Sequence, residues 1–163
     1  MSETGALAVD AQQQFLLVSL GHLQLGLPVA SLVKTVRLVA VTALPGAPSV
    51  VEGVINYHGR LVAVLDIRAR FNLAPEPLSV TQYLVLVKLA QRLVAIRVDR
   101  VLDLITIDAA RIEPATDIHR ASHFIAGIAR LDDGLMVIHE LGRFLNDLEA
   151  AQLDQALLEP PSQ

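Results

Sequence analysis

Residues 53–67 read GVINYHGRLVAVLDI, and residues 127–141 read GIARLDDGLMVIHEL. Each stretch runs from a glycine and a branched aliphatic residue into a polar turn. Four apolar residues, one further residue, an acid and an aliphatic residue then follow. Apolar runs on both sides of a glycine-containing turn are typical of β-hairpins. Two copies of the same hairpin pattern in one chain predict two related β subdomains.

The rest of the chain extends this pattern. Short apolar runs bounded by Gly, Pro, Asn and Asp predict further strands at residues 15–20, 23–27, 35–39, 82–89, 93–98 and 101–107. Short helical turns are predicted at residues 29–34 and 108–112, and a terminal helix capped by Asn146 or Asp147 is expected to reach residue 158. The run 83–89 is apolar on both faces, so it is expected to be buried between the two subdomains.

These patterns predict an all-β protein of about five strands per subdomain, with short helices and a C-terminal α-helix. We expect one domain over residues 14–158, with flexible tails at residues 1–13 and 159–163.

Composition excludes several classes of protein. Hydrophobic residues make up 53% of the 163 residues, yet no apolar run approaches the roughly twenty residues of a membrane helix. The chain has no cysteine, which excludes disulfides, thiolate zinc sites and cysteine nucleophiles. The net charge is -4 and only 4% of residues are aromatic, so a nucleic-acid partner is not expected. The polar start shows no signal peptide, which favours the cytoplasm.

Candidate catalytic or metal-binding residues are few. His119 and His123 stand four apart and could share a helical face as zinc ligands do, but no third ligand is evident, so solvated polar residues are favoured. Asp66 and Glu140 end matching strands. We interpret them as caps of backbone donors rather than a catalytic carboxylate pair. Asp99 is interpreted as a strand-end cap as well. The sequence therefore predicts no catalytic, cofactor-binding or metal-binding residue.

One longer stretch resembles a known family. Residues 44–71 read LPGAPSVVEGVINYHGRLVAVLDIRARF, which resembles the signature of CheW-like chemotaxis coupling domains. The resemblance continues through VDRV at 98–101, IEP at 112–114 and GIA at 127–129, and it covers the chain from about residue 14 to the terminal helix. It implies two intertwined five-stranded SH3-like β-barrels.

The resemblance also implies a function. CheW-like proteins are non-enzymatic adaptors that couple the cytoplasmic tip of chemoreceptors to the regulatory domain of a CheA-type histidine kinase. By resemblance we expect a cytoplasmic adaptor that is monomeric when isolated, with no cofactor, nucleic acid or membrane insertion. One alternative is a CheW-like adaptor of a pathway that controls surface attachment, biofilm or pili. Another is a small β-barrel enzyme or ligand-binding module, which a deep polar pocket with convergent titratable groups would favour.

The resemblance further implies which residues contact the receptor. These are Val33, Thr35, Val36, Asn56 and His58. Family members commonly carry Glu at the position of Thr35 and Arg at the position of His58. Both partners of that charged pair, which the resemblance places beside the receptor groove, are therefore replaced here. Histidine also titrates near neutral pH, whereas arginine stays charged.

Three glycines are predicted to be structural. Gly53 and Gly127 occupy equivalent positions in the two hairpin repeats, and Gly59 lies in the turn 57–60, where it is free to take a positive φ.

Overall fold

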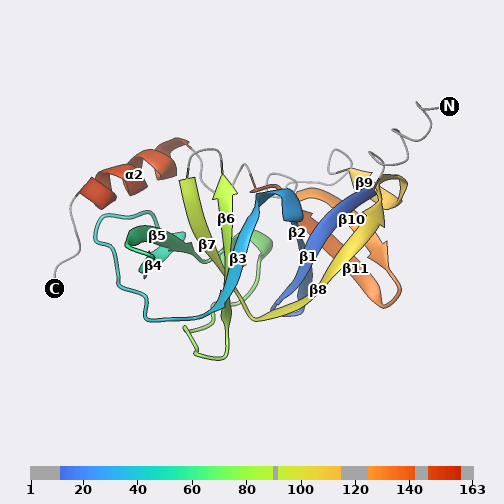
Figure 1. The fold of residues 1–163 in the computed structure, drawn as a ribbon, viewed down its shortest axis with the longest axis horizontal. Helices are drawn as coiled ribbons and strands as arrows, with labels where there is room; N and C mark the ends of the chain where they lie inside the picture. The colour runs from blue at the N-terminus through green and yellow to red at the C-terminus, as the bar shows by residue number, and fades with distance from the viewer. Residues whose placement is uncertain (1–11, 90–91, 115–124, 142–146, 159–163) are drawn as a thin grey trace.

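The chain folds into short strands and a C-terminal helix (Figure 1). The computed structural model describes residues 12–89, 92–114, 125–141 and 147–158. The strands are β1 (Gln12–Leu20), β2 (Leu23–Pro28), β3 (Leu32–Arg37), β4 (Val51–Tyr57), β5 (Arg60–Leu65), β6 (Tyr83–Leu89), β7 (Arg92–Val98), β8 (Arg100–Asp108), β9 (Ile112–Pro114), β10 (Ile125–Leu131) and β11 (Gly134–His139). The 3₁₀ turns are η1 (Val29–Ser31), η2 (Arg68–Phe71) and η3 (Ala109–Arg111), and the α-helix is α2 (Asp147–Leu158).

The strands form a five-stranded and a six-stranded sheet, and five strands of each correspond in order. Their orders are β3-β6-β7-β5-β4 and β8-β1-β2-β11-β10-β9. In each sheet two antiparallel hairpins are joined by one parallel pair, which is β5 with β7 in the first and β2 with β11 in the second. This correspondence agrees with the hairpin repeat seen in the sequence.

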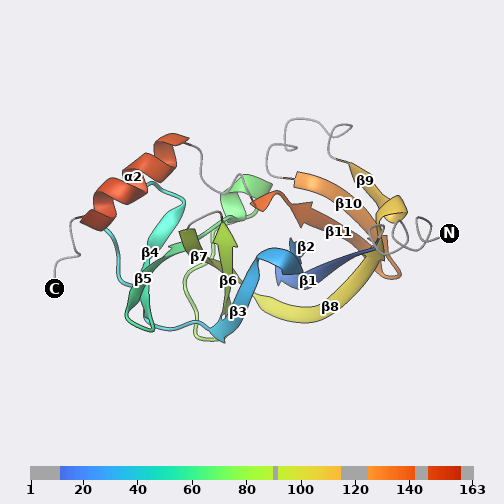
Figure 2. The same cartoon turned by 45° about the horizontal axis from the view of Figure 1, so that its top comes forward.

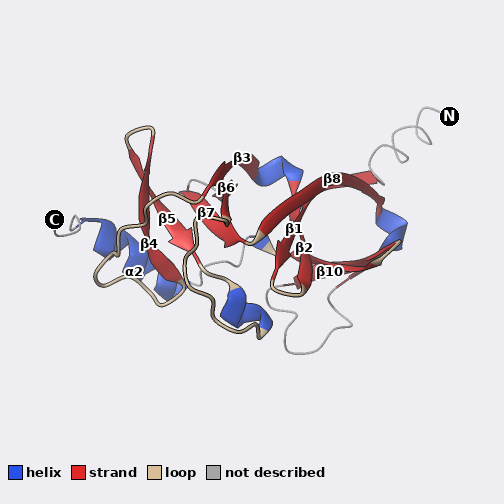
Figure 3. Cartoon of the chain, turned by 90° about the horizontal axis from the view of Figure 1, so that it is seen from below, coloured by secondary structure: helices blue, strands red, loops and turns tan. Residues whose placement is uncertain are grey.

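The sheets curve into two SH3-like barrels that lie side by side (Figure 3). The barrel of β3 to β7 is called the first barrel, and the barrel of β1, β2 and β8 to β11 the second. Because β1 and β2 begin the chain but pair with strands from its end, the barrels are intertwined. The predicted fold class is therefore confirmed. The three-residue strand β9 adds a sixth member to the second sheet, where the first sheet has only an isolated bridge between Thr42 and Val54.

Hydrophobic residues fill the interior of each barrel and the space between them. Leu84 and Leu86 of β6 belong to the core of the first barrel. Val85 and Val87 of the same strand belong to the larger core between the barrels. The prediction that this strand is buried on both faces is confirmed. The helix α2 lies along the first barrel (Figure 2) and contributes Leu153 to the larger core.

Gly53 and Gly127 share a structural role. The register shifts at both glycines, as in a β-bulge. A Cβ on Gly53 would lie 2.2 Å from the carbonyl oxygen of Thr42, and a Cβ on Gly127 would lie 2.8 Å from that of Glu113. A neighbouring segment therefore crosses each hairpin so closely that a side chain would collide with it.

Two local expectations differ from the structure. The helix expected at residues 29–34 is only the turn η1, and β3 starts at Leu32. Val33, Thr35 and Val36 are β-branched residues that favour an extended backbone, and pairing with β6 outweighs the helical spacing of the apolar residues. Residues 12 and 13, expected in the N-terminal tail, pair with the end of β8 instead.

The remaining tail residues, 1–11 and 159–163, and the helix cap expected at Asn146 lie outside the described residues. Among the described residues, no helix is long and apolar enough to cross a membrane.

Candidate interaction surface and a buried polar network

Strand β3 carries three of the five residues expected to face a receptor. Val33 is 48% exposed, whereas Thr35 and Val36 are half-buried. Val36 packs against the core of the first barrel, so only part of this strand can face a partner. Lys34, which the sequence analysis did not single out, is exposed between Val33 and Thr35 and makes no ion pair with any described residue.

The turn between β4 and β5 carries the other two expected residues. His58 and Gly59 have φ values of 52° and 83°, as a two-residue type I′ hairpin turn requires at both central positions. The side-chain oxygen of Asn56 accepts a hydrogen bond of 2.8 Å from the Gly59 amide, which holds the turn. His58 is exposed and rests edge-on against Tyr57, with 4.4 Å between ring centroids. The expected positive φ of Gly59 is present, and the positive φ of His58 is an additional feature.

The two segments come from opposite ends of the first sheet. Both contribute to the core of the same barrel, through Val36 of β3 and Tyr57 at the end of β4. In Figures 2 and 3 β3 and the β4–β5 turn lie on the side of the barrel away from α2. No hydrogen bond or ion pair joins Thr35 to His58, both of which are described. The structure thus places the five residues around one barrel without linking that pair directly.

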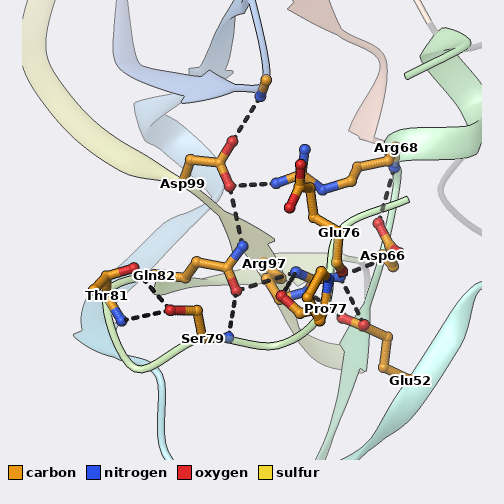
Figure 4. Close-up of polar contacts among 11 residues, drawn as sticks. Glu52, Asp66, Arg68, Glu76, Pro77, Ser79, Thr81, Gln82, Arg97 and Asp99 are labelled. Atoms are coloured by element: carbon orange, nitrogen blue, oxygen red, sulfur yellow. Dashed lines mark hydrogen bonds and ion pairs between the residues drawn. The ribbon is translucent and has the colours of Figure 1, made fainter. Parts of the chain in front are cut away.

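A buried arginine lies at the centre of a polar network (Figure 4). The side chain of Arg97 is 1% exposed. Its guanidinium donates two hydrogen bonds of 2.6 and 2.9 Å to the carboxylate of Glu52 and one of 3.3 Å to Asp66. It also donates to the side-chain oxygen of Gln82 at 3.1 Å. The backbone oxygens of residues 76 and 77 accept from it at 2.9 and 3.4 Å. A buried charge with this many partners ties β7, β4 and the loop before β6 together.

The network continues to Asp99, which links the two barrels. Asp99 accepts a hydrogen bond of 2.7 Å from the amide of Gly21 in the β1–β2 turn and one of 3.0 Å from Gln82. It also pairs with Arg68 of η2, whose side chain is only 2% exposed. Burial pushes the pKa of Asp99 upward, but the bonds from Gly21 and Gln82 and the charge of Arg68 outweigh it and hold the pKa below its ordinary value. Asp99 thus does more than cap a strand.

The other carboxylates of interest do not form a catalytic pair. Asp66 accepts a hydrogen bond of 3.0 Å from the backbone amide of Arg68, as expected of a cap at a strand end. Glu140, by contrast, lines a separate hollow of about 520 Å³ near α2 together with His139. Among the described residues no group of three His, Cys, Asp or Glu side chains could hold a metal ion. His119 and His123 lie outside the described part of the chain.

His139 is an unusual histidine because its side chain is 1% exposed. Burial, together with the charge of Arg70, lowers its pKa to about 3, although a backbone hydrogen bond at Glu140 acts in the opposite direction. Its ring packs edge-on against Phe71, with 5.3 Å between centroids. His139 is therefore a neutral core residue rather than an acid–base group.

The fold and its motifs agree with a match to one protein family. The family model described as the CheW-like domain matches residues 14–149. The chain belongs to this family. Chemotaxis protein CheW of Klebsiella aerogenes is 25% identical over 144 residues, which cover 87% of both chains. Chemotaxis protein CheW of Rhizobium meliloti is 34% identical over 89 residues, 55% of this chain and 56% of that one.

A solved structure of another CheW-like protein has the same fold. Scaffolding protein TtCheW from Thermoanaerobacter tengcongensis matches with a TM-score of 0.76 and 27% sequence identity, over 84% of this chain and 90% of that chain. The two-barrel architecture is therefore that of the family.

The buried network has almost no signal in the sequence. The apolar run 93–98 contains one arginine, Arg97, and this was the one signal of a buried charge. Gln82 follows a turn and Arg68 precedes one. Polar residues are common at such positions, so neither residue gave a sign of burial.

Proposed function

We propose that this chain is a non-enzymatic signalling adaptor that couples chemoreceptors to a CheA-type histidine kinase. The observation that carries the proposal is the match of the CheW-like domain to residues 14–149, because the match spans both barrels in order. The relatives named as chemotaxis proteins and the neighbour named as a scaffolding protein support the same proposal.

The mechanism of such an adaptor is thermodynamic rather than chemical. An adaptor that binds kinase and receptor together holds them at high effective concentration. If the two states of the receptor bind the adaptor with different affinity, the kinase experiences that difference as a coupling free energy. Two barrels with separate surfaces, joined through Asp99 and a shared core, suit this task.

The receptor surface in this proposal comprises Val33, Thr35, Val36, Asn56 and His58. These residues differ in exposure, and we assign them different roles accordingly. Val33 and His58 are exposed and can contact a partner, whereas Val36 supports β3 from inside the barrel. Asn56 acts through the turn, since its side chain holds the Gly59 amide.

Calorimetry with the regulatory domain of the cognate kinase tests the adaptor role. We expect a saturable heat change at concentrations of about tens of micromolar, corresponding to a free energy of about -7 kcal/mol. The interface should be of the transient signalling size, about 1,000–1,600 Å². Absence of heat together with no shift on gel filtration would exclude the kinase as a partner.

A charge placed on β3 tests the receptor surface separately. Val33→Asp should weaken binding of the receptor tip by about tenfold or more, since a carboxylate would be desolvated at an apolar contact. Leu135→Asp is the matched control, because Leu135 is 55% exposed but lies on the hairpin of the second barrel. If the two variants bind the receptor tip equally, β3 does not form the receptor surface.

The pair Thr35 and His58 is proposed to set receptor choice. The double variant Thr35→Glu with His58→Arg restores the commoner pair, and it should shift binding toward receptors that suit that pair. Both changes are needed together because either charge alone would be unpaired at the interface. Competition binding between two receptor tips measures the preference, and an unchanged ratio would remove these residues from the account.

A further inference from the structure

A polar hollow of about 810 Å³ opens where β3 ends, beside residues 76–83 and the start of β8. Arg37 and Arg100, from different barrels, both line it. Its volume lies within the range of about 300–1,000 Å³ that is typical of ligand sites. The hydroxyls of Ser79 and Thr81 and the ring of Tyr83 complete one side.

The positive charges of the two arginines in this hollow are not paired with a carboxylate of any described residue. Arg37 and Arg100 are exposed, and neither makes an ion pair with any described residue. The guanidinium carbon of Arg37 lies 5.2 Å from the ring centroid of Tyr83, a cation–π contact that positions the group without neutralising it. Arg68 and Arg97, by contrast, are buried against carboxylates.

The charges of the side chains that line the hollow sum to a net positive charge. Asp99 lines the hollow, but its charge is balanced by Arg68, and Gly21 and Gln82 occupy its oxygens. Glu76 is the other carboxylate in the lining. One positive charge therefore remains from Arg37, Arg100 and Glu76, in a protein whose net charge is -4.

We propose that this hollow binds an acidic segment of a partner protein, with a carboxylate held by Arg37 and Arg100. Arginine forks match carboxylates in shape as well as charge. A carboxylate is favoured over a nucleic-acid backbone because the site offers two cations rather than a stripe, and Glu76 would repel a run of phosphates. The inference rests on the proposed adaptor function, since the segment belongs to a signalling partner.

The site can be tested with a peptide probe that is independent of any partner. We would titrate the full chain with a blocked hexapeptide of alternating Glu and Ala, and in parallel with its Gln-for-Glu counterpart, while recording the backbone amide resonances. The expected result is a saturable shift of the amides of Thr81, Tyr83 and Val101, which line the hollow, with the Glu peptide alone and weakened by salt. The double variant R37Q/R100Q should abolish it, whereas the control R111Q/R130Q, which removes two exposed arginines elsewhere, should retain it.

Three results would overturn the proposal: no shift with the Glu peptide, equal shifts with both peptides, or shifts that survive in R37Q/R100Q. An equal response to inorganic phosphate would also contradict it, because the site would then take any small anion.

Partner binding separates this inference from the adaptor function. R37Q/R100Q should bind the kinase domain or the receptor tip about tenfold more weakly than wild type at low salt, the loss expected for one charge-assisted pair of hydrogen bonds. If wild type and R37Q/R100Q bind both partners equally, the adaptor function stands and the acidic-segment site is wrong. If wild type binds neither partner, the adaptor function is wrong, and the peptide titration alone decides the site.

Discussion

Replacing Arg97 by methionine tests the buried network most sharply. The guanidinium of Arg97 makes six hydrogen bonds to other described residues, three of them to the carboxylates of Glu52 and Asp66. The methionine fills much of the same volume but offers no donor, so both carboxylates would lose the positive charge that faces them, and Asp66 would keep only its bond from the Arg68 amide. Breaking a buried ion pair from one side costs about 3–5 kcal/mol. Because Glu52 is 16% and Asp66 26% exposed, water relieves part of this penalty, and we expect about 3 kcal/mol.

Arg92→Met is the matched control. Arg92 pairs with Asp154 of α2, but these side chains are 28% and 61% exposed, so the loss should be below about 1 kcal/mol. Urea unfolding of the three proteins gives the free energies of unfolding, with equal m-values expected. A loss for Arg97→Met within about 0.5 kcal/mol of the control would refute the view that the network stabilises the fold.

Four further substitutions test other parts of the structure. Gly53→Ala and Gly127→Ala should each lower the free energy of unfolding by about 1–3 kcal/mol, since the new Cβ meets a backbone oxygen of the crossing segment; losses below about 0.5 kcal/mol would contradict the close approach. His139→Leu should flatten the acid side of the stability curve. The pKa of His139 is about 3 in the folded state and ordinary in the unfolded state, so between about pH 6.5 and 3 only the unfolded state takes up this proton. The free energy of unfolding of the wild type should therefore fall by about 1.4 kcal/mol for each pH unit of acidification in this range. Equal slopes in the two proteins would refute this. Asp99→Asn should destabilise the protein above about pH 5 and lose its effect as the pH falls through the lowered pKa of Asp99; a constant difference across that range would contradict it.

The hairpin repeat was sufficient to predict two related β subdomains, whereas the SH3-like barrels were implied by the family resemblance. Strands in this protein are short, apolar and separated by turn residues, so local periodicity carries most of the information. The turn at His58 and Gly59 followed from the glycine alone. The helix predicted at residues 29–34 was wrong, because the pairing of β3 with β6 holds the chain extended from Leu32, and sequence periodicity does not reveal this pairing.

The polar network could not be predicted for a related reason. Its members, such as Gly21, Gln82 and Asp99, are far apart in sequence, and they meet only after the barrels pack together. Asp99 was correctly seen as a cap at a strand end, but its partners Gly21 and Arg68 come from different barrels. The receptor surface rests on family resemblance, because exposed residues such as Val33 carry no local signal that separates a partner contact from ordinary surface.

The most direct test of the adaptor account is a measurement of simultaneous binding. A complex of this chain with the kinase regulatory domain would be titrated with the receptor tip while the mass of the complex is followed by light scattering. The account predicts a ternary complex containing all three proteins, with a receptor affinity that differs from that of the free adaptor. Displacement of the kinase domain by the receptor tip, or failure of either to bind, would contradict it.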